Sequence, residues 1–230
     1  MVNTFDRIVI AVPDLQAAQV EYRQLLGAPL PQQARDKSPS FWFALPNTVI
    51  ELVQSRGDTA VISGIVFGSE TASVGDEVVE NSLGLDIRLC SGASTSGLRA
   101  RHPDIEAGDF RVDHLVLRTT SAADCIDLFG RQLGIRLALD QTVPQWGGRM
   151  LFFRTGKLTL EVIESQREKP AEDYFWGIAY QCADLEKTAA RLTARGVALS
   201  GIRAGRKQGS VVATLKSHCL GIPTLLIGPG

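Results

Sequence analysis

Hydrophobic positions recur along the chain with two periods, and four segments show them in the same order. Each segment begins with a short run rich in β-branched and aromatic residues, which is typical of a buried strand. The runs start near positions 7, 64, 114 and 177. Apolar residues three and four positions apart then predict helices over 15–26, 72–83, 122–133 and 185–195. The chain therefore repeats one strand–helix unit four times.

A glycine ends each predicted helix, at positions 27, 84, 134 and 196. Glycine adopts the left-handed backbone conformation that turns a helix sharply into a strand. The strand starts and the glycines of the first and third units keep the same separation of 107 residues, which supports a true repeat. Asp14 and Asp184 precede two of the helices and are expected to cap them.

Three of the units continue with three further strands, and the last of these reads "TVIELVQ", "KLTLEVIE" or "IPTLLIG". The unit is therefore βαβββ. The second unit is truncated, because after "LDIRLC" it passes into a Gly/Ser-rich segment typical of a loop. This change of composition near Gly108 predicts an N-terminal half over residues 1–108 and a C-terminal half over residues 109–230.

A βαβββ unit used in pairs, with "DHLVL" opening a copy and "LTLEVIE" closing it, resembles the glyoxalase I, bleomycin-resistance and extradiol-dioxygenase group, the vicinal oxygen chelate superfamily. The resemblance covers nearly the whole chain. It implies an α+β fold in which paired βαβββ units form curved, cup-like mixed sheets with the helices outside. It also implies a ligand inside the cup, a metal-binding His on the first strand of a unit and a Glu on the last. The fold hosts several chemistries and does not by itself imply one reaction.

His114 and Glu161 fall at these two family positions. Because alternate residues of a strand share a face, His114 is expected to point to the same side as Val116 and Arg118, and Glu161 to the same side as Ile163. We therefore predict His114 and Glu161 as the catalytic pair and as ligands of a divalent zinc, nickel, iron or manganese ion.

The expected ligand set is incomplete. The other first-strand positions hold Arg7, Gly64 and Gly177, and the other identifiable last-strand positions hold Glu51 and Leu226. Three alternatives stay open at this point. The first and third units pair and bring Glu51 to His114 and Glu161 as a third metal ligand, or His218 in "KSHCLG" supplies a second imidazole. In the third alternative no metal binds, and His114 with Glu161 is an acid/base pair or a buried hydrogen-bonded pair.

Cationic and aromatic residues of the C-terminal half are predicted to bind an anionic ligand. The segment "GIRAGRKQGS" is expected at the rim of the cup, where its charges would hold a carboxylate or phosphate. Strand alternation places Arg149 and Phe153 on one wall. The alternative is that the basic loop serves solubility and the large aromatics are core. The predicted substrate-binding residues are Trp146, Arg149, Phe153, Trp176, Arg203, Arg206, Lys207 and His218.

Charge and composition narrow the classes of partner. Lys and Arg total 24 against 25 Asp and Glu, a net charge of -1, so no nucleic-acid partner is expected. No apolar run reaches the roughly 18 residues that a membrane span needs, and the N-terminus lacks the pattern of a secretory signal, so a cytoplasmic location is expected. The 4 cysteines form no CxxC pair and are expected to be reduced thiols.

These observations favour an enzyme that acts on a small oxygenated organic anion by lyase- or isomerase-type proton transfer, with or without a metal. Extradiol ring cleavage is disfavoured, because Gly177 and Leu226 of the fourth unit cannot coordinate iron. The alternative is a metal-free small-molecule binding protein like the bleomycin-resistance members. The resemblance also implies a homodimer.

Overall fold

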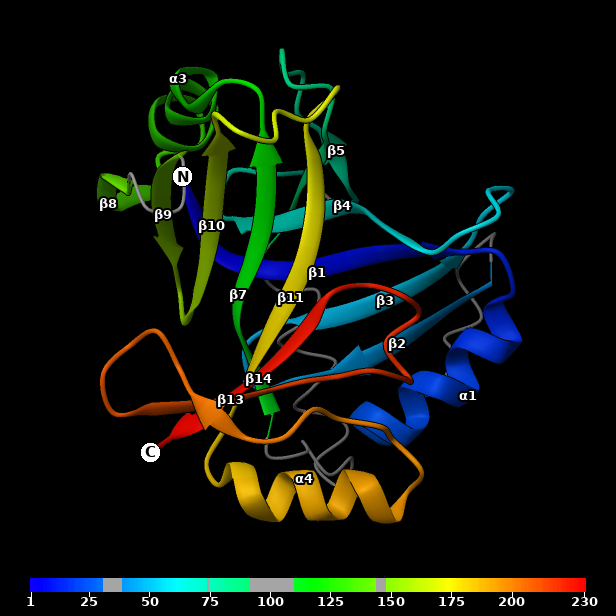
Figure 1. Cartoon of the computed structure of the whole chain (residues 1–230). Coiled ribbons are helices and arrows are strands. Elements are labelled where there is room, and N and C mark those ends of the chain that lie inside the picture. Colours follow the sequence, from blue (N-terminus) through cyan, green and yellow to red (C-terminus); the bar gives the residue numbers. More distant parts are fainter. Residues whose placement is uncertain (31–38, 74, 92–109, 144–147) are drawn as a thin grey trace.

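In the computed structural model, which describes residues 1–30, 39–73, 75–91, 110–143 and 148–230, strands dominate and form one curved fourteen-stranded sheet (Figure 1). The elements of the N-terminal half are β1 (Val2–Val12), α1 (Leu15–Leu26), β2 (Ser40–Ala44), β3 (Val49–Gln54), β4 (Val61–Ser69), β5 (Glu77–Val78) and β6 (Asp86–Ser91). Those of the C-terminal half are β7 (Phe110–Thr119), α3 (Ala122–Cys125), the π-helix η1 (Ile126–Gln132), β8 (Arg136–Val143), β9 (Gly148–Thr155), β10 (Leu158–Ser165), β11 (Tyr174–Cys182), α4 (Leu185–Ala194), β12 (Arg203–Ala204), β13 (Ser210–Thr214) and β14 (Thr224–Pro229). The fold is the predicted α+β arrangement of curved sheet and outer helices.

The first and last strands of every unit lie side by side and parallel, β1 with β3, β4 with β6, β7 with β10, and β11 with β14. The first strands of successive units pair antiparallel, β1 with β4 and β7 with β11. The alternative that the first and third units pair is therefore wrong, because strands from neighbouring units have formed the pairs. The two halves of the sheet meet where Ile62 of β4 bridges Phe175 of β11. The predicted boundary near Gly108 lies outside the described residues and stays a prediction.

The helices begin and end where the caps predict. The carboxylate of Asp14 accepts a hydrogen bond of 2.9 Å from the Ala17 amide at the start of α1, and that of Asp184 accepts one of 3.0 Å from the Lys187 amide at the start of α4. Gly27, Gly134 and Gly196 follow the three helical segments with φ angles of 92°, 69° and 85°. Each glycine therefore adopts the positive φ that ordinary residues avoid.

The core of the C-terminal half lies between the sheet and its helices. Alternate residues of β7 and β10 are buried against the π-helix side, which leaves the intervening residues to face the opposite, concave side. The fully buried side chains on the helix side include Leu115, Leu117, Val162, Phe129 and Phe153. Burial of such side chains supplies the main driving force for this layer, about 1.5–3 kcal/mol for each.

The predicted helix over 72–83 is wrong. The segment instead contains β5, whose Glu77 and Val78 pair with Leu89 and Arg88 of β6. The side-chain NH₂ group of Asn81 donates hydrogen bonds to the Val79 and Leu85 carbonyls, and its side-chain oxygen accepts one from the Leu85 backbone amide. These side-chain hydrogen bonds stabilise a turn in place of a helix. Two of the apolar residues whose spacing suggested a helix, Val79 and Leu83, are nevertheless buried.

Within the described part of the chain, no helix combines the length and the apolar character that crossing a bilayer requires.

Candidate functional site

A cavity of about 1600 Å³ opens on the concave side of the C-terminal half, and every residue that lines it lies between Asp113 and Pro229. Its floor is formed by β8, β9, β10, β7 and β11, which are consecutive neighbours in the sheet (Figure 1). Strand β14 and the segment from Arg203 to Ser210 complete the opposite wall. Both walls, as far as the structure describes them, come from the third and fourth units of one chain. The predicted homodimer stays a prediction.

The strand register arranges the residues of the floor in rows that run across the five strands. The first row is polar and consists of Arg136, Arg154, Thr159, His114 and Ala179. The second row is mainly apolar and consists of Leu139, Phe152, Glu161, Val116 and Gly177. Part of a third row consists of Gln141, Met150, Ile163 and Arg118. His114 and Glu161 therefore lie in adjacent rows of the floor, on the shared face that strand alternation predicts.

His114 stands between two carboxylates. Its Nδ1 lies 2.9 Å from Oδ2 of Asp113, and its Nε2 lies 3.5 Å from Oε2 of Glu161. The hydrogen bond from His114 lowers the pKa of Asp113 below its ordinary value, against the opposing effect of its partial burial. The side chains of His114 and Glu161 keep 20% and 12% of their surface exposed, so both are accessible from the cavity. This arrangement can accept and return a proton.

Asp113 is a residue that sequence analysis missed. Strict alternation would turn it away from His114, but the pairing of β7 with β11 shifts between Ala179 and Tyr180. His114 pairs with Ala179 and Val112 with Tyr180, so Asp113 is the extra residue of a bulge and also lines the cavity. A bulge depends on the partner strand, and no signal in the local sequence reports it.

A resident divalent metal does not fit the described residues. Among them, no group of three or more His, Cys, Asp and Glu side chains is close enough to hold an ion. The place equivalent to His114 on the fourth unit is Gly177, where a Cβ would meet the Pro223 carbonyl oxygen at 2.5 Å. A histidine there would collide with the backbone of Pro223, just before β14. The predicted zinc, nickel, iron or manganese site thus has His114 and Glu161 and lacks the other donors, because Asp113 contacts the opposite ring nitrogen of His114.

The last-strand position of the fourth unit also needs correction. Glu161 pairs with Val116, two residues after His114, and the equivalent pair in the fourth unit is Leu225 with Ala179. Leu226, which the sequence alignment of repeats placed there, is fully buried in the core. Leu225 lines the cavity instead, and it too cannot coordinate a metal.

Glu51 is not brought to His114. It lies on β3 opposite Val9, as Glu161 lies opposite Val116, so it holds the equivalent place in the first unit. There its carboxylate accepts from Nε of Arg7 at 3.1 Å and from Nε1 of Trp42 at 2.9 Å. Arg7 stands where His114 stands in the third unit, so a guanidinium replaces the imidazole.

The buried Arg7 is held by three carboxylates, those of Asp6, Glu51 and Asp76. Burial works to lower the pKa of Arg7, but the hydrogen bond that Arg7 donates to Asp76 and the three negative charges raise this pKa above its ordinary value. The guanidinium carbon of Arg7 lies 4.9 Å from the ring centre of Trp42. The N-terminal half therefore fills this position with an internal ion-pair cluster.

The predicted ligand-binding residues separate into two groups. Four of them line the cavity: Arg203, Arg206, Lys207 and Trp176. The first three belong to the segment that was predicted to form the rim. Trp146 lies outside the described residues. His218 does not line the cavity; its Nδ1 lies 2.8 Å from the Ser217 hydroxyl, in the loop before β14.

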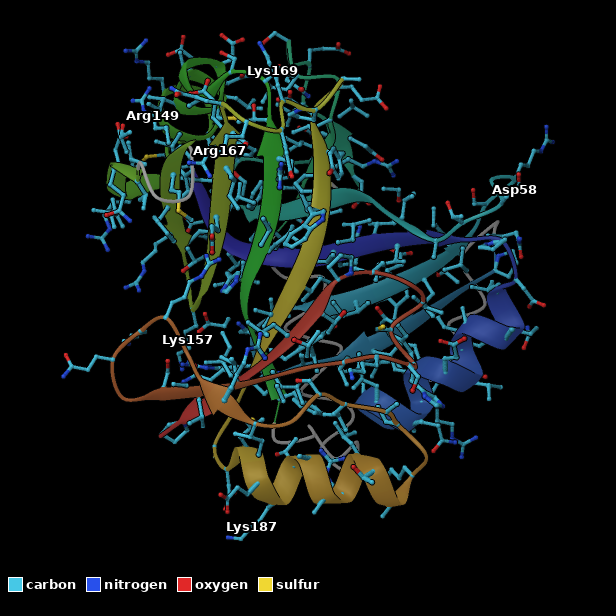
Figure 2. The ribbon with its side chains drawn as sticks, viewed as in Figure 1. Asp58, Arg149, Lys157, Arg167, Lys169 and Lys187 are labelled. Atoms are coloured by element: carbon cyan, nitrogen blue, oxygen red, sulfur yellow. The ribbon has the colours of Figure 1, made fainter. Side chains whose placement is uncertain are left out.

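Arg149 and Phe153 share a face of β9, as predicted, but it is the face away from the cavity. Arg149 lies near the outer edge of the sheet (Figure 2) and forms a two-pronged pair with Asp140 at 2.8 and 2.6 Å. Phe153 is fully buried, 5.5 Å from Phe129 between ring centres. Phe152 faces the cavity in its place, directly opposite Glu161.

The missed Phe152 had a signal in the sequence. Thr155 pairs with Leu158, so only Gly156 and Lys157 separate β9 from β10, and Gly156 has a φ of 58°. A two-residue turn fixes the register of a hairpin. Counting back from "TGKL" places Phe152 opposite Glu161, whereas the hydrophobic pattern of "MLFF" does not distinguish the two faces.

Comparison with known proteins gives the class of this domain. Residues 113–214 match the model of the Glyoxalase/Bleomycin resistance protein/Dioxygenase superfamily. The protein therefore contains a domain of this superfamily, which confirms the resemblance inferred from its repeats. A mutant of 4-hydroxymandelate synthase from Streptomyces coelicolor shares the fold, with a TM-score of 0.73 and 15% identity over 100% of this chain and 93% of that one. At this identity the likeness shows the fold alone.

One curated relative is similar in sequence to part of the chain. It is the ethylmalonyl-CoA/methylmalonyl-CoA epimerase of Cereibacter sphaeroides, 41% identical over 69 residues. The matched segment is 29% of this chain and 52% of the epimerase. The chain thus spans about half the length of this relative, which is an isomerase.

Proposed function

We propose that the protein is an isomerase-type enzyme that removes and returns a proton on the carbon next to a carbonyl group of an oxygenated organic anion. The observation that carries this proposal is His114 between Asp113 and Glu161 on the floor of a large cavity. The similarity to an epimerase supports the type of reaction, because inverting a carbon centre requires such a proton transfer.

In the proposed reaction each group has a separate task. When Nδ1–H of the neutral imidazole donates to Asp113, the lone pair of Nε2 is free to accept a proton. The 3.5 Å between Nε2 and Glu161 is longer than an ordinary hydrogen bond, so neither atom is fully engaged before a substrate arrives. Glu161 then stabilises the imidazolium that forms when Nε2 takes the proton. When the imidazolium returns a proton to the same face of the enolate, the carbon exchanges its hydrogen with solvent, and inversion requires delivery of a proton to the opposite face.

The charge of the cavity suits an anionic substrate. Its acidic lining residues are Asp113, Glu161 and Glu168. Its cationic lining residues are Arg118, Arg136, Arg154, Arg167, Arg203, Arg206 and Lys207. This excess of positive charge attracts an anion and lowers the free energy of the negative charge that develops on a carbonyl oxygen during proton removal.

The proposal is tested by proton exchange, which does not require knowledge of the product. The purified protein is incubated in D₂O with a panel of anionic 2-substituted acyl thioesters, including ethylmalonyl-CoA and methylmalonyl-CoA, and loss of the proton on the substituted carbon is followed by NMR. We expect exchange with at least one compound. His114→Gln and Glu161→Gln should slow it by about 10²- to 10⁴-fold.

The matched control is Glu186→Gln on the exposed face of α4, which should exchange at the wild-type rate. Absence of exchange across the panel, or an unchanged rate in His114→Gln, would contradict the proposal.

A metal-free binding protein is the second candidate, favoured by Gly177 and Leu225 at the two positions where the fourth unit would supply ligands. It predicts a compound that binds the wild type and His114→Gln with equal affinity and undergoes no exchange in either. Calorimetry on the same panel distinguishes the two functions. A cytoplasmic location and a homodimer stay predictions, to be checked by cell fractionation and by the mass of the protein in solution.

A further inference from the structure

Two arginines face one another at one end of the polar row of the cavity floor. Arg136 of β8 pairs directly with Arg154 of β9, and both line the cavity. Residues directly opposite on antiparallel strands bring their side chains close together, and like charges in this arrangement repel. Neither residue was predicted from the sequence to bind a ligand.

Within the described residues, neither guanidinium makes a hydrogen bond or an ion pair. Other arginines of this half do have carboxylate partners, as Arg149 has Asp140 and Arg131 has Asp127. Arg136 and Arg154 thus face the cavity without a carboxylate partner among the described residues. An anion placed between them would replace repulsion by two sets of charge-assisted hydrogen bonds.

The row also fixes how far this pair lies from the proposed reaction centre. Arg154 pairs with Thr159, and Thr159 pairs with His114. With strands about 4.8 Å apart, the Cα atoms of Arg154 and Arg136 lie about 10 and 14 Å from that of His114. The apolar Leu139 and Phe152 occupy the adjacent row beside the two arginines.

We propose that Arg136 and Arg154 form a clamp for a phosphoryl group at one end of an elongated ligand whose other end reaches His114. Two guanidinium groups carry two positive charges and present forked donors, which match a phosphoryl dianion better than a single carboxylate. The cavity of about 1600 Å³ exceeds the roughly 300–1,000 Å³ of ordinary small-molecule sites, as an extended ligand requires. This inference deepens the proposed function, because it names the chemical class of the substrate.

The clamp is tested by direct binding, with inorganic pyrophosphate as the probe and acetate as the comparison anion, in isothermal titration calorimetry. We expect wild-type protein to bind pyrophosphate more tightly than acetate. Arg136→Gln and Arg154→Gln should each weaken pyrophosphate binding about tenfold, the effect of losing one charge-assisted contact. Replacement of either arginine by lysine keeps the charge and loses the fork, so it should recover part of the affinity.

The matched control is Lys157→Gln, at the turn of the same β9–β10 hairpin (Figure 2) and outside the cavity lining. It removes the same charge close by and should change the affinity less than twofold, roughly the limit for a distant charge in salt solution. Equal losses in Lys157→Gln and Arg154→Gln, or undetectable pyrophosphate binding by the wild type, would overturn the clamp. The melting temperature provides a second measurement. Pyrophosphate should raise it in the wild type and leave it unchanged in a variant that carries both Arg136→Gln and Arg154→Gln.

The binding assay involves no turnover, so it separates this inference from the proposed function. His114→Gln should slow proton exchange by about 10²- to 10⁴-fold and leave pyrophosphate binding intact. Failure of pyrophosphate binding with normal exchange would refute the clamp alone.

Discussion

The backbone of Pro223 lies so close to Gly177 that a side chain at position 177 has no room, which excludes a second imidazole there. The substitution Gly177→Ala tests this close approach. An added Cβ would meet the Pro223 carbonyl oxygen at 2.5 Å and the Pro223 Cβ at 3.1 Å. That carbonyl also accepts the Ile178 amide at 3.0 Å, so moving it away disturbs a hydrogen bond. Gly64, the equivalent residue of the second unit, lies against the Asp86 carbonyl in the same way, at 2.7 Å.

The magnitude follows from three contributions. Overpacking against the backbone costs about 1–3 kcal/mol. Disturbing the Ile178–Pro223 hydrogen bond costs about 0.5–1.5 kcal/mol. The reduced entropy of the unfolded chain returns about 0.4–1 kcal/mol. Gly177→Ala should therefore lower the free energy of unfolding by about 0.5–4 kcal/mol.

Urea denaturation followed by tryptophan fluorescence measures this change, with Gly201→Ala as the matched control. Gly201 has open space where a Cβ would go, so its substitution should leave the stability unchanged or raise it by up to about 1 kcal/mol. Gly177→His should be at least as destabilised as Gly177→Ala and should bind no stoichiometric metal. If Gly177→Ala is as stable as the wild type, the close approach of Pro223 is refuted, and with it this explanation of the missing metal ligand.

Three further predictions concern packing, thiols and pH. Phe153→Ala should lose about 3–5 kcal/mol of stability in urea denaturation, and Phe152→Ala distinctly less, because only Phe153 is fully buried. Burial raises the pKa of Cys125 to about 12, so iodoacetamide should label it only after unfolding, as judged by mass spectrometry. The lowered pKa of Asp113 stabilises the fold above the unfolded value of about 3.9, and this contribution disappears as the pH falls through the folded value. The difference in unfolding free energy between wild type and Asp113→Asn should therefore shrink as the pH falls below the unfolded pKa value.

Part of the candidate site was predictable because it depends on periodicity within single strands. The alternation of "DHLVL" and "LTLEVIE" is sufficient to place His114 and Glu161 on the face opposite the buried leucines. Cationic residues in a glycine-flanked loop likewise predicted that Arg203 and its neighbours would lie at the rim. These inferences need no knowledge of which strands are neighbours.

The rest of the site depends on pairing between strands. Asp113 turns toward His114 through a bulge against β11, and the row that opposes Arg136 to Arg154 exists only once β8 and β9 are in register. The assignment of Arg149 and Phe153 to the cavity was wrong for a related reason. In "MLFF" both faces are apolar, so hydrophobicity alone could not tell the core side from the ligand side.

The sequence by itself determined the fourfold unit, the capped helices in three of its copies, and the two residues that place an imidazole near a carboxylate. These features follow from local periodicity and from glycines at the helix ends, where the backbone takes the left-handed conformation that other residues avoid. Tertiary structure alone decided which units pair, that Glu51 is held by Arg7 far from His114, and that the backbone beside Gly177 leaves no room for a side chain. Such features depend on the packing of distant strands, whose close approach is not encoded in any one segment.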